Sequence, residues 1–450
     1  MGILQGSVLS PTLFLIFASE LLEICEAPRE RISGLGFVED TTIIIYGTDA
    51  SQNCRKLTET HEKCQDWAER SGAKFAPHKY ELIHFKRGGK KPTTGIRING
   101  IELKPVDSAR ILGVRVDSRL TWAKHAEVVK VKAESQTRAL TRLTSSVWGA
   151  SYHKSRTLYK QVVMPGLTYG AAIWKRPDTS GNKQQRMTVM FERIQNRCLR
   201  TITGAYRATP IEMIHSEALI LPIKTALDRM ILRDAERFET SGIKAIIEAA
   251  CTHIKRNTRP NVGTRRYPPT NMEKTMVWKQ AKQAETDCDG QTKAWTDVWA
   301  EKQWRDKWTT YQEAKRGETY PALQIQPKQH MEIHKVLRKA ESSLLTQIRT
   351  GRIGLNQFLH RRGVPGFESP YCQCGEAEQT VQHILDCQQI GTSRIRLLQT
   401  AGTTDLKELL STIRGTKALL KWWMESGFQM QFKLAAEALA TENSENGELI

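Results

Sequence analysis

Apolar and polar positions follow a strand-like pattern in the first quarter of the chain and a helical pattern over most of the rest. Residues 35–46 form two apolar runs that meet at an acidic pair. The β-branched residues of the second run, Thr41 to Tyr46, predict a strand that we expect to be buried. Residues 80–116 predict further short strands, and Asn99-Gly100 between apolar residues is a two-residue hairpin signal.

Helices are predicted elsewhere from capping residues and from spacings of three and four. Ser10-Pro11 is an N-cap followed by proline at the first helical position, so a helix should run from Pro11 to about Cys25. Its first half is apolar on nearly every face, so we expect it to be buried. Residues 51–72 predict an amphipathic helix, and residues 122–241 predict several more.

Composition indicates the kind of partner. The 450 residues carry a formal net charge of +19, and 39% of them are hydrophobic, so the chain can fold into several domains. A positive excess this large predicts a polyanionic partner, namely RNA or DNA. An anionic membrane surface is the alternative. No run of about eighteen apolar residues is present, so we expect no membrane span.

Cysteine usage and the N-terminus indicate the compartment. The chain has nine cysteines, unevenly spaced, which do not make a disulfide framework. The apolar N-terminus lacks a basic segment and is interrupted by Ser10-Pro11, so a secretory signal is not expected. We therefore expect an intracellular protein of the nucleus, the cytoplasm or both, and not a secreted one.

Four residues near the C-terminus have the spacing of a metal site. The motif C-x-C-x8-H-x3-C comprises Cys372, Cys374, His383 and Cys387. His383 and Cys387 are four residues apart and share a helix face, with Thr380 before them as a cap. Three thiolates and one imidazole predict one structural Zn²⁺ in a closed tetrahedral site. Free buried cysteines are the alternative.

The acidic pair Glu39-Asp40 is a second candidate site. Two adjacent carboxylates at the tip of a hairpin repel each other, and a divalent cation would relieve that repulsion because hard cations take oxygen ligands. A solvated turn is the alternative.

Three motifs resemble those of a known family. Gly2 to Phe14 looks like the Gln-Gly-Ser motif of reverse transcriptases, in which Gln5, Gly6 and Ser7 would line the template and nucleotide pocket. Phe37-Val38-Glu39-Asp40 is similar to the Tyr/Phe-Ala-Asp-Asp loop that holds catalytic metal, which makes Glu39 and Asp40 the catalytic candidates. Residues 76–85 resemble the lysine-bearing motif of that pocket, with Lys79 as its lysine.

The resemblance continues toward the C-terminus. Ile111-Leu112-Gly113-Val114, followed by Asp117, Leu120, Trp122 and His125, is similar to the primer-grip region of non-LTR retrotransposon reverse transcriptases, so Leu112 and Gly113 would contact the primer. The cysteine-histidine motif resembles the C-terminal Cys-Cys-His-Cys knuckle of non-LTR retrotransposon proteins, and residues 343–352 are similar to the segment before that knuckle in fungal elements. The implied function is that of an RNA-directed DNA polymerase acting on element RNA and a primer–template.

Two departures bear on activity. The family has aspartate where this chain has Glu39, whose extra methylene displaces a carboxylate, and alanine where it has Val38. The family's first catalytic aspartate precedes the Gln-Gly-Ser motif, so we expect that strand, the fingers and one metal ligand to be absent here. Two-metal polymerisation needs both sources of carboxylate.

These features are compatible with three functions. The first is a decayed reverse-transcriptase part that binds nucleic acid without polymerising. The second is an active polymerase, using Mg²⁺, that is completed by another reverse-transcriptase chain or has a misplaced start. The third is a zinc-dependent nucleic-acid-binding protein with no enzymatic role.

The expected fold class is α+β. A truncated reverse-transcriptase palm, made of a buried helix and β-hairpins, should occupy residues 1–120, followed by helical regions. The expected order of these is a helical thumb and connection at 121–254, a basic proline-rich linker at 255–271, a tryptophan-rich helical segment at 272–325, a basic helix with the zinc knuckle and closing helices at 326–440, and a disordered acidic tail at 441–450.

Basic and aromatic residues supply the candidate nucleic-acid contacts. The basic ones are Lys86, Arg87, Lys90, Lys91, Arg349, Arg352, Arg361 and Arg362. A solvated surface loop is the alternative for the four in residues 86–91. Trp295/Trp299 and Trp304/Trp308 are pairs one helical turn apart, which either stack on unpaired bases or pack between helices.

Overall fold

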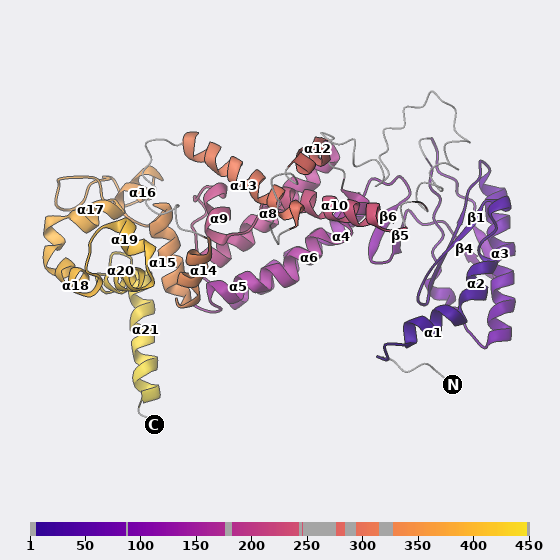
Figure 1. The fold of residues 1–450 in the computed structure, drawn as a ribbon, viewed down its shortest axis with the longest axis horizontal. Coiled ribbons are helices and arrows are strands. Elements are labelled where there is room, and N and C mark those ends of the chain that lie inside the picture. The colour runs from indigo at the N-terminus through magenta and orange to yellow at the C-terminus, as the bar shows by residue number, and fades with distance from the viewer. Residues whose placement is uncertain are drawn as a thin grey trace. The chain divides into compact units, whose positions relative to one another are not determined.

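The computed structural model describes residues 6–86, 89–175, 182–242, 245, 276–283, 294–314 and 327–447. The chain divides into two compact units, Met1–Glu127 and Val128–Ile450. The first contains short strands and helices and the second is helical, so the coarse α+β assignment is confirmed (Figure 1). The boundaries predicted within residues 121–440 stay predictions.

The strands of the first unit form three separate antiparallel hairpins, in which β1 pairs with β2, β3 with β4 and β5 with β6. Their bounds are β1 (Ile32–Phe37), β2 (Asp40–Ile45), β3 (Ile96–Ile98), β4 (Ile101–Leu103), β5 (Ser108–Ile111) and β6 (Val114–Asp117). The predicted Asn99-Gly100 turn is confirmed, with φ of 48° and 78°. The predicted strand at 41–46 corresponds to β2, but its residues 41–45 are half-buried rather than buried.

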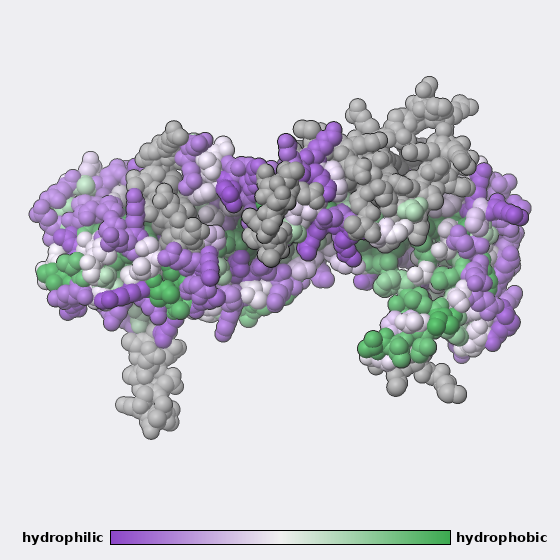
Figure 2. Space-filling model, in the orientation of Figure 1, coloured by the Kyte–Doolittle hydropathy of each residue, from purple (hydrophilic) through white to green (hydrophobic). Residues whose placement is uncertain are grey.

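The predicted apolar helix differs from the one observed. It is divided at Ala18 into α1 (Ser10–Phe17) and α2 (Ser19–Ile24), and Leu9, not Ser10, is the N-cap of α1. The prediction that its first half is buried was wrong, because α1 has no buried residue and Ile16 is 66% exposed. Within the described part of this unit, Phe17 packs its ring against Trp67, at 5.4 Å between centroids. Figure 2 shows green, hydrophobic surface over α1.

Helix α3 (Ala50–Ser71) organises the first unit. Asp49 begins it, since its Oδ1 accepts a hydrogen bond from the Ser51 backbone N–H at 2.8 Å, and Gly72 ends it in the left-handed region at φ 70°. The buried face of α3, including Cys64 and Trp67, packs against Leu21 and Cys25. The predicted amphipathic helix at 51–72 is confirmed.

The second unit is built from helices, as predicted for 122–241. They begin with α4 (Ala123–Leu143), α5 (Tyr152–Leu158), a π-helical turn (Tyr159–Val163), α6 (Met164–Thr168), α7 (Ala171–Trp174), α8 (Asn182–Thr203), α9 (Ile211–Ala218) and α10 (Ile223–Thr240). They continue with α12 (Met276–Gln283), α13 (Trp295–Ala314), α14 (Pro327–Lys335), α15 (Lys339–Thr350), α16 (Asn356–Arg361) and α17 (Val381–Asp386). The last are α18 (Gly391–Ala401), α19 (Leu406–Ser411), α20 (Ile413–Glu425) and α21 (Met430–Gly447).

Helix α15 lies in the core of this unit and joins its early and late helices. Nearly all of its side chains are buried, and Leu344 shares one apolar cluster with Trp423 and Phe432. On another side α15 packs against the C-terminal end of α8, where the Lys339 Nζ donates to the carbonyls of Thr201 and Ile202 at 2.9 and 2.7 Å. Helices on both sides of the predicted linker therefore share one packed unit.

A glycine permits this close approach. Gly204 follows α8 with φ 69°, and a Cβ there would lie 2.9 Å from the Ser343 Cα on α15. Any side chain at position 204 would force the two helices apart.

The structure favours helix packing for three tryptophans. Trp295 and Trp299 of α13 are buried, and Trp278 of α12 meets Trp295 edge-on, at 5.7 Å between ring centroids. Arg229 of α10 also pairs with Asp297 of α13 at 3.0 Å. Trp304 and Trp308 are half-buried and stack at 6.3 Å.

Some predictions fall on other parts of the chain. The linker at 255–271, Gln5 and Arg87 lie outside the described residues. Helix α21 extends to Gly447, into the tail that was expected to be disordered, and residues 448–450 lie outside the description. None of the helices in the described ranges is long and apolar enough to cross a membrane.

Candidate functional site

Cys372 and Cys374, the first two cysteines of the C-terminal motif, lie on a tight turn. The Gly375 N–H donates to the Cys372 carbonyl at 2.9 Å, and Gly375 has φ 79°, a conformation that favours glycine. The Cys372 N–H in turn donates to the Ala377 carbonyl at 2.9 Å. The turn thereby holds Cys372 and Cys374 on one side of a short loop.

Helix α17 supplies His383, and its C-cap is Cys387. Its N-cap is Thr380, whose Oγ1 accepts a hydrogen bond from the His383 N–H at 3.0 Å, so the predicted cap is confirmed. The Cys387 N–H donates to the His383 carbonyl at 2.7 Å, one helical turn on. Cys387 is the C-cap of α17, with extended backbone, so the predicted shared helix face is not what brings it close to His383; it follows His383 directly after the helix ends.

The four side chains converge. One potential ligand atom from each of Cys372, Cys374, His383 and Cys387 lies within 4.8 Å of all the others, and the Cys374 Sγ lies 3.2 Å from the His383 Nε2. Burial raises the pKa of the Cys372 thiol, whereas a hydrogen bond from the Glu376 backbone lowers the pKa of Cys374. The three sulfurs and one nitrogen fit the tetrahedral donor set of structural zinc.

The site is anchored to the helical core. Val381, Ile384 and Leu385 of α17 belong to the apolar cluster that contains Trp423. Arg394 of α18 donates through Nη1 to the carbonyls of Leu385 and Cys387, at 2.6 and 3.3 Å. Arg394 was not predicted from the sequence. It binds carbonyls at the C-terminal end of α17 from another helix, and no local sequence pattern identifies such a residue.

The acidic pair Glu39-Asp40 lies at the tip of the β1–β2 hairpin. Phe37 pairs with Asp40, so Val38 and Glu39 form a two-residue turn, and Val38 has φ 50°, which is strained for a β-branched residue. Both acids are exposed. Two groups of three or more metal-ligating side chains occur among the described residues, and neither contains Glu39 or Asp40.

The remaining pocket and primer-grip candidates lie on separate elements. Gly6 has φ 92°, and the Ser7 Oγ accepts a hydrogen bond from the Leu9 N–H at 3.3 Å before α1. Lys79 is exposed at the end of the 3₁₀ turn Pro77–Lys79. Leu112 and Gly113 form the tight turn between β5 and β6, with φ of 46° and 82°.

Asp117, next to the primer-grip candidates, has a clear structural role. Its buried carboxylate accepts hydrogen bonds from the backbone N–H groups of Arg119, Thr121 and Trp122, and from the Thr121 hydroxyl, at 2.6–3.2 Å. These bonds hold the loop in which Leu120 and Trp122 adopt positive φ of 53° and 64°. The sequence similarity in this segment therefore coincides with a structured loop that leads into α4.

The predicted basic contacts of the first unit differ in their environments. Lys86 and Lys90 are exposed. Lys91 pairs with Asp107 at 2.5 Å, and this contact lowers the pKa of the Asp107 carboxyl. Lys91 must break an ion pair before it can contact a phosphate.

The predicted basic contacts of the second unit also differ in how exposed they are. Arg361 and Arg362 are exposed, and Arg361 pairs with Glu378 of the zinc loop at 3.3 Å. Arg362 donates to the Ala208 carbonyl at 3.1 Å. Arg352 is half-buried, and Arg349 is not at the surface at all, because it is 4% exposed and bound to Glu217.

Comparison with known proteins gives one kind of relative. The chain is 25% identical over 208 residues to the RNA-directed DNA polymerase from mobile element jockey of Drosophila melanogaster, a match to 45% of this chain and 22% of that protein. It is 22% identical over 389 residues to the retrovirus-related Pol polyprotein from type-1 retrotransposable element R1 of Bradysia coprophila, a match to 85% of this chain and 34% of that protein.

A second R1 Pol polyprotein, from Nasonia vitripennis, is 26% identical over 204 residues, which cover 44% of this chain and 58% of that protein. The homologues are thus reverse transcriptases and Pol polyproteins of non-LTR retrotransposons, as the sequence motifs predicted. The chain spans about a quarter of the length of the first curated relatives that it matches. No protein-family profile matches the chain, and no solved structure does.

Proposed function

We propose that this chain is the nucleic-acid-binding part of a non-LTR retrotransposon RNA-directed DNA polymerase, and that it does not polymerise by itself. The observation that carries the proposal is the convergence of Cys372, Cys374, His383 and Cys387 in a chain whose homologues are retrotransposon polymerases. In this proposal residues 1–120 are a partial palm, residues 121–254 a thumb and connection, and the last third of the chain carries the zinc knuckle.

Electrostatics supports RNA and DNA as the partners. The chain has a net charge of +19, and a bound Zn²⁺ would order the Cys372–Cys387 loop beside the exposed bases Arg361 and Arg362. Such a surface suits single-stranded or structured nucleic acid, bound largely through phosphates. A protein with these partners is proposed to act in the nucleus, the cytoplasm or both.

The geometry of the acidic pair supports the absence of polymerisation. A two-metal mechanism clamps the attacking and leaving oxygens between ions that several carboxylates hold in fixed positions. Glu39 in the two-residue turn and Asp40 at the start of β2 are both exposed, and Glu39 is one methylene longer than the aspartate of the resembled motif. Mg²⁺ would have a catalytic role here only if the polymerase site were functional.

A salt titration tests the binding proposal. The full chain is titrated onto fluorescent single-stranded RNA, single-stranded DNA and an RNA–DNA hybrid at several salt concentrations. The slope of log K against log salt should be about −0.7 to −0.9 for each phosphate neutralised, with little dependence on base sequence. An affinity that does not change between low and physiological salt would overturn the proposal.

Two other functions remain as candidates. An active reverse transcriptase completed by another chain would gain template-dependent synthesis when that chain is added, and would lose it on Asp40→Ala. A zinc-dependent nucleic-acid-binding protein with no enzymatic role would bind equally well without residues 1–120. The homology to named polymerases favours the first proposal over this last one.

A further inference from the structure

A second group of metal-ligating side chains lies in the core of the helical unit, apart from the Cys372–Cys387 site. It consists of Glu217 from α9 and of His330 and His334 from α14. One potential ligand atom from each lies within 4.8 Å of the others, and all three residues are buried. The two histidines are four residues apart, which places them one above the other on a helix face.

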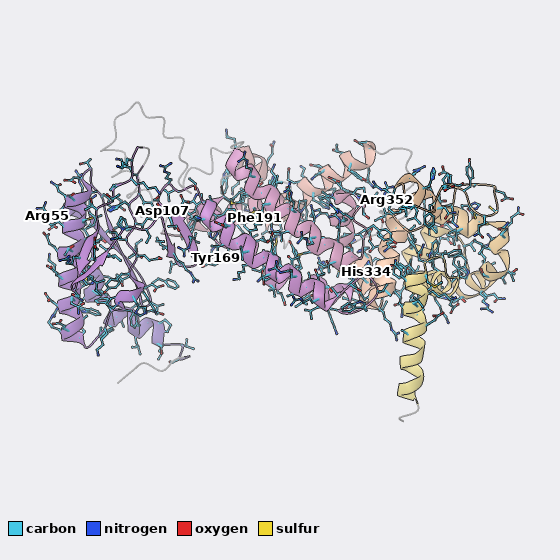
Figure 3. All side chains as sticks on the ribbon, turned by 180° about the vertical axis from the view of Figure 1, so that it is seen from behind. Arg55, Asp107, Tyr169, Phe191, His334 and Arg352 are labelled. Carbon is cyan, nitrogen blue, oxygen red and sulfur yellow. The ribbon has the colours of Figure 1, made fainter. Side chains whose placement is uncertain are left out.

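His334 is the residue that calls for a ligand. It is 0% exposed, and neither its Nδ1 nor its Nε2 has a hydrogen-bond partner among the described residues. Its ring stacks on Tyr152 at 4.0 Å between centroids, with 17° between the planes (Figure 3 labels His334). Buried polar atoms are nearly always paired, so two unpaired nitrogens on one ring need an explanation.

His330 is held as a metal ligand would be. Its Nε2 lies 2.8 Å from the Glu217 backbone carbonyl, to which it donates, and this leaves Nδ1 for another partner. Metal-bound histidines generally donate their second nitrogen to a carbonyl or carboxylate in this way, which fixes the ring. The Tyr152 hydroxyl donates to the same carbonyl at 2.7 Å and so holds the other side of the pocket.

The Glu217 carboxylate has acceptor positions that its partner Arg349 does not use. Its carboxylate oxygens both lie 3.0 Å from the Arg349 Nε. Two carboxylate oxygens offer about four acceptor positions, so a guanidinium and a metal ion can share the group. Arg349 then orients the Glu217 carboxylate, just as the Glu217 backbone carbonyl orients the His330 ring.

We propose that Glu217, His330 and His334 hold one buried divalent transition-metal ion, with Zn²⁺ the best match to two imidazoles and a carboxylate. The site joins α9 to α14. Its three protein ligands leave one position for a water molecule, and its burial indicates a structural role. The competing account is a neutral histidine pair that only packs against Tyr152.

Metal counting on the full chain tests the proposal. Protein purified without chelator should contain two zinc ions per chain, one for each group. His334→Phe keeps an aromatic ring on Tyr152 but removes both nitrogens, and should contain one. Cys374→Ser should also contain one zinc ion, because it should lose the ion of the Cys372–Cys387 group and keep the other. His215→Phe changes a buried histidine outside both groups and should keep both ions.

Zinc K-edge absorption on Cys374→Ser protein gives the second measurement. The remaining zinc should show nitrogen and oxygen neighbours without sulfur. This sulfur-free spectrum decides the matter even if His334→Phe fails to fold, because zinc left at the Cys372–Cys387 group would still have sulfur neighbours. A single zinc in the unsubstituted chain with sulfur and nitrogen neighbours only, or two ions retained in His334→Phe, would overturn the proposal.

Discussion

The Arg349 Nε lies 3.0 Å from both carboxylate oxygens of Glu217, and the two side chains are 4% and 0% exposed. This pair connects α15 to α9 across 132 residues of sequence. Arg349 was predicted from the sequence to contact nucleic acid, but it is held in the core. Its charge is compensated inside the protein and does not contribute to the surface that we propose for RNA and DNA.

In zinc-free protein, Arg349→Met should lower the free energy of unfolding by about 3–5 kcal/mol, because the buried Glu217 carboxylate then has no cation beside it. Urea unfolding followed by circular dichroism measures the change. The double variant with Glu217→Gln should recover part of the loss, since no buried charge then remains unpaired.

The matched control is Arg361→Met. Arg361 also pairs with a glutamate, Glu378, but their side chains are 57% and 40% exposed. An exposed pair contributes only about 0–1 kcal/mol, so this variant should unfold almost as the unsubstituted chain does. Equal losses in the two variants would contradict the assignment of Arg349 to the core.

The sequence predicted those features that depend on neighbouring residues. Asn99-Gly100 specifies its own turn, Thr380 caps the helix that carries His383, and Gly72 ends α3, because each signal acts within a few residues. The four-residue metal motif was found in the same way.

Features that depend on distant partners were not predictable. The sequence predicts the same role for Arg349 and Arg361, a contact with nucleic acid. Only the fold shows that Glu217 lies beside Arg349. The apolar run of α1 predicts burial, but which surface covers a helix is decided by the tertiary structure. His330 and His334 have metal-ligand spacing, yet their third partner, Glu217, comes from another helix.

Lys339 should make stability depend on pH. Its side chain is buried at the end of α8, and burial lowers its pKa to about 7, from an ordinary value of 10.5. Between these two values the unfolded chain binds more protons than the folded one, so stability should rise with pH above about 7. The greatest slope that one such group contributes is about 1.4 kcal/mol per pH unit.

The measurement is the free energy of unfolding of the chain and of Lys339→Met between pH 7 and 9. The difference between the two curves isolates Lys339 from other titrating groups, and it should change in favour of the unsubstituted chain as pH rises. A constant difference would show that Lys339 has an ordinary pKa in the folded protein.

Loss of zinc from the Cys372–Cys387 site should disturb the helical core as well as the loop. Val381, Ile384 and Leu385 pack in the same cluster as Trp423, so the site is not a separate module. His383→Ala or a strong chelator should therefore increase hydrogen exchange in residues 370–388 and also in α20. An ordered loop in protein shown to contain no zinc would exclude a structural metal at these residues.

Primer extension should not be detectable with the chain alone, in Mg²⁺ or in Mn²⁺, on an RNA template. Glu39→Asp restores the shorter side chain but leaves the pair exposed at the tip of the β1–β2 hairpin, so it should not restore synthesis. Incorporation that depends on template and is abolished by Asp40→Ala would establish a working polymerase site instead.

Arg361→Gln/Arg362→Gln should weaken binding to RNA and DNA, because it removes two exposed charges next to the zinc loop. If both side chains contact phosphates, the slope of log K against log salt should become less steep by about 1.4–1.8. Lys421→Gln is the control, since Lys421 is 78% exposed in α20 and lies outside the predicted contacts. If only the net charge mattered, the slope would change in every variant in proportion to the charges removed. If the binding surface is localised, the slope should change only in the arginine variant. Equal slopes for the arginine variant and the unsubstituted chain would exclude Arg361 and Arg362 from the nucleic-acid surface.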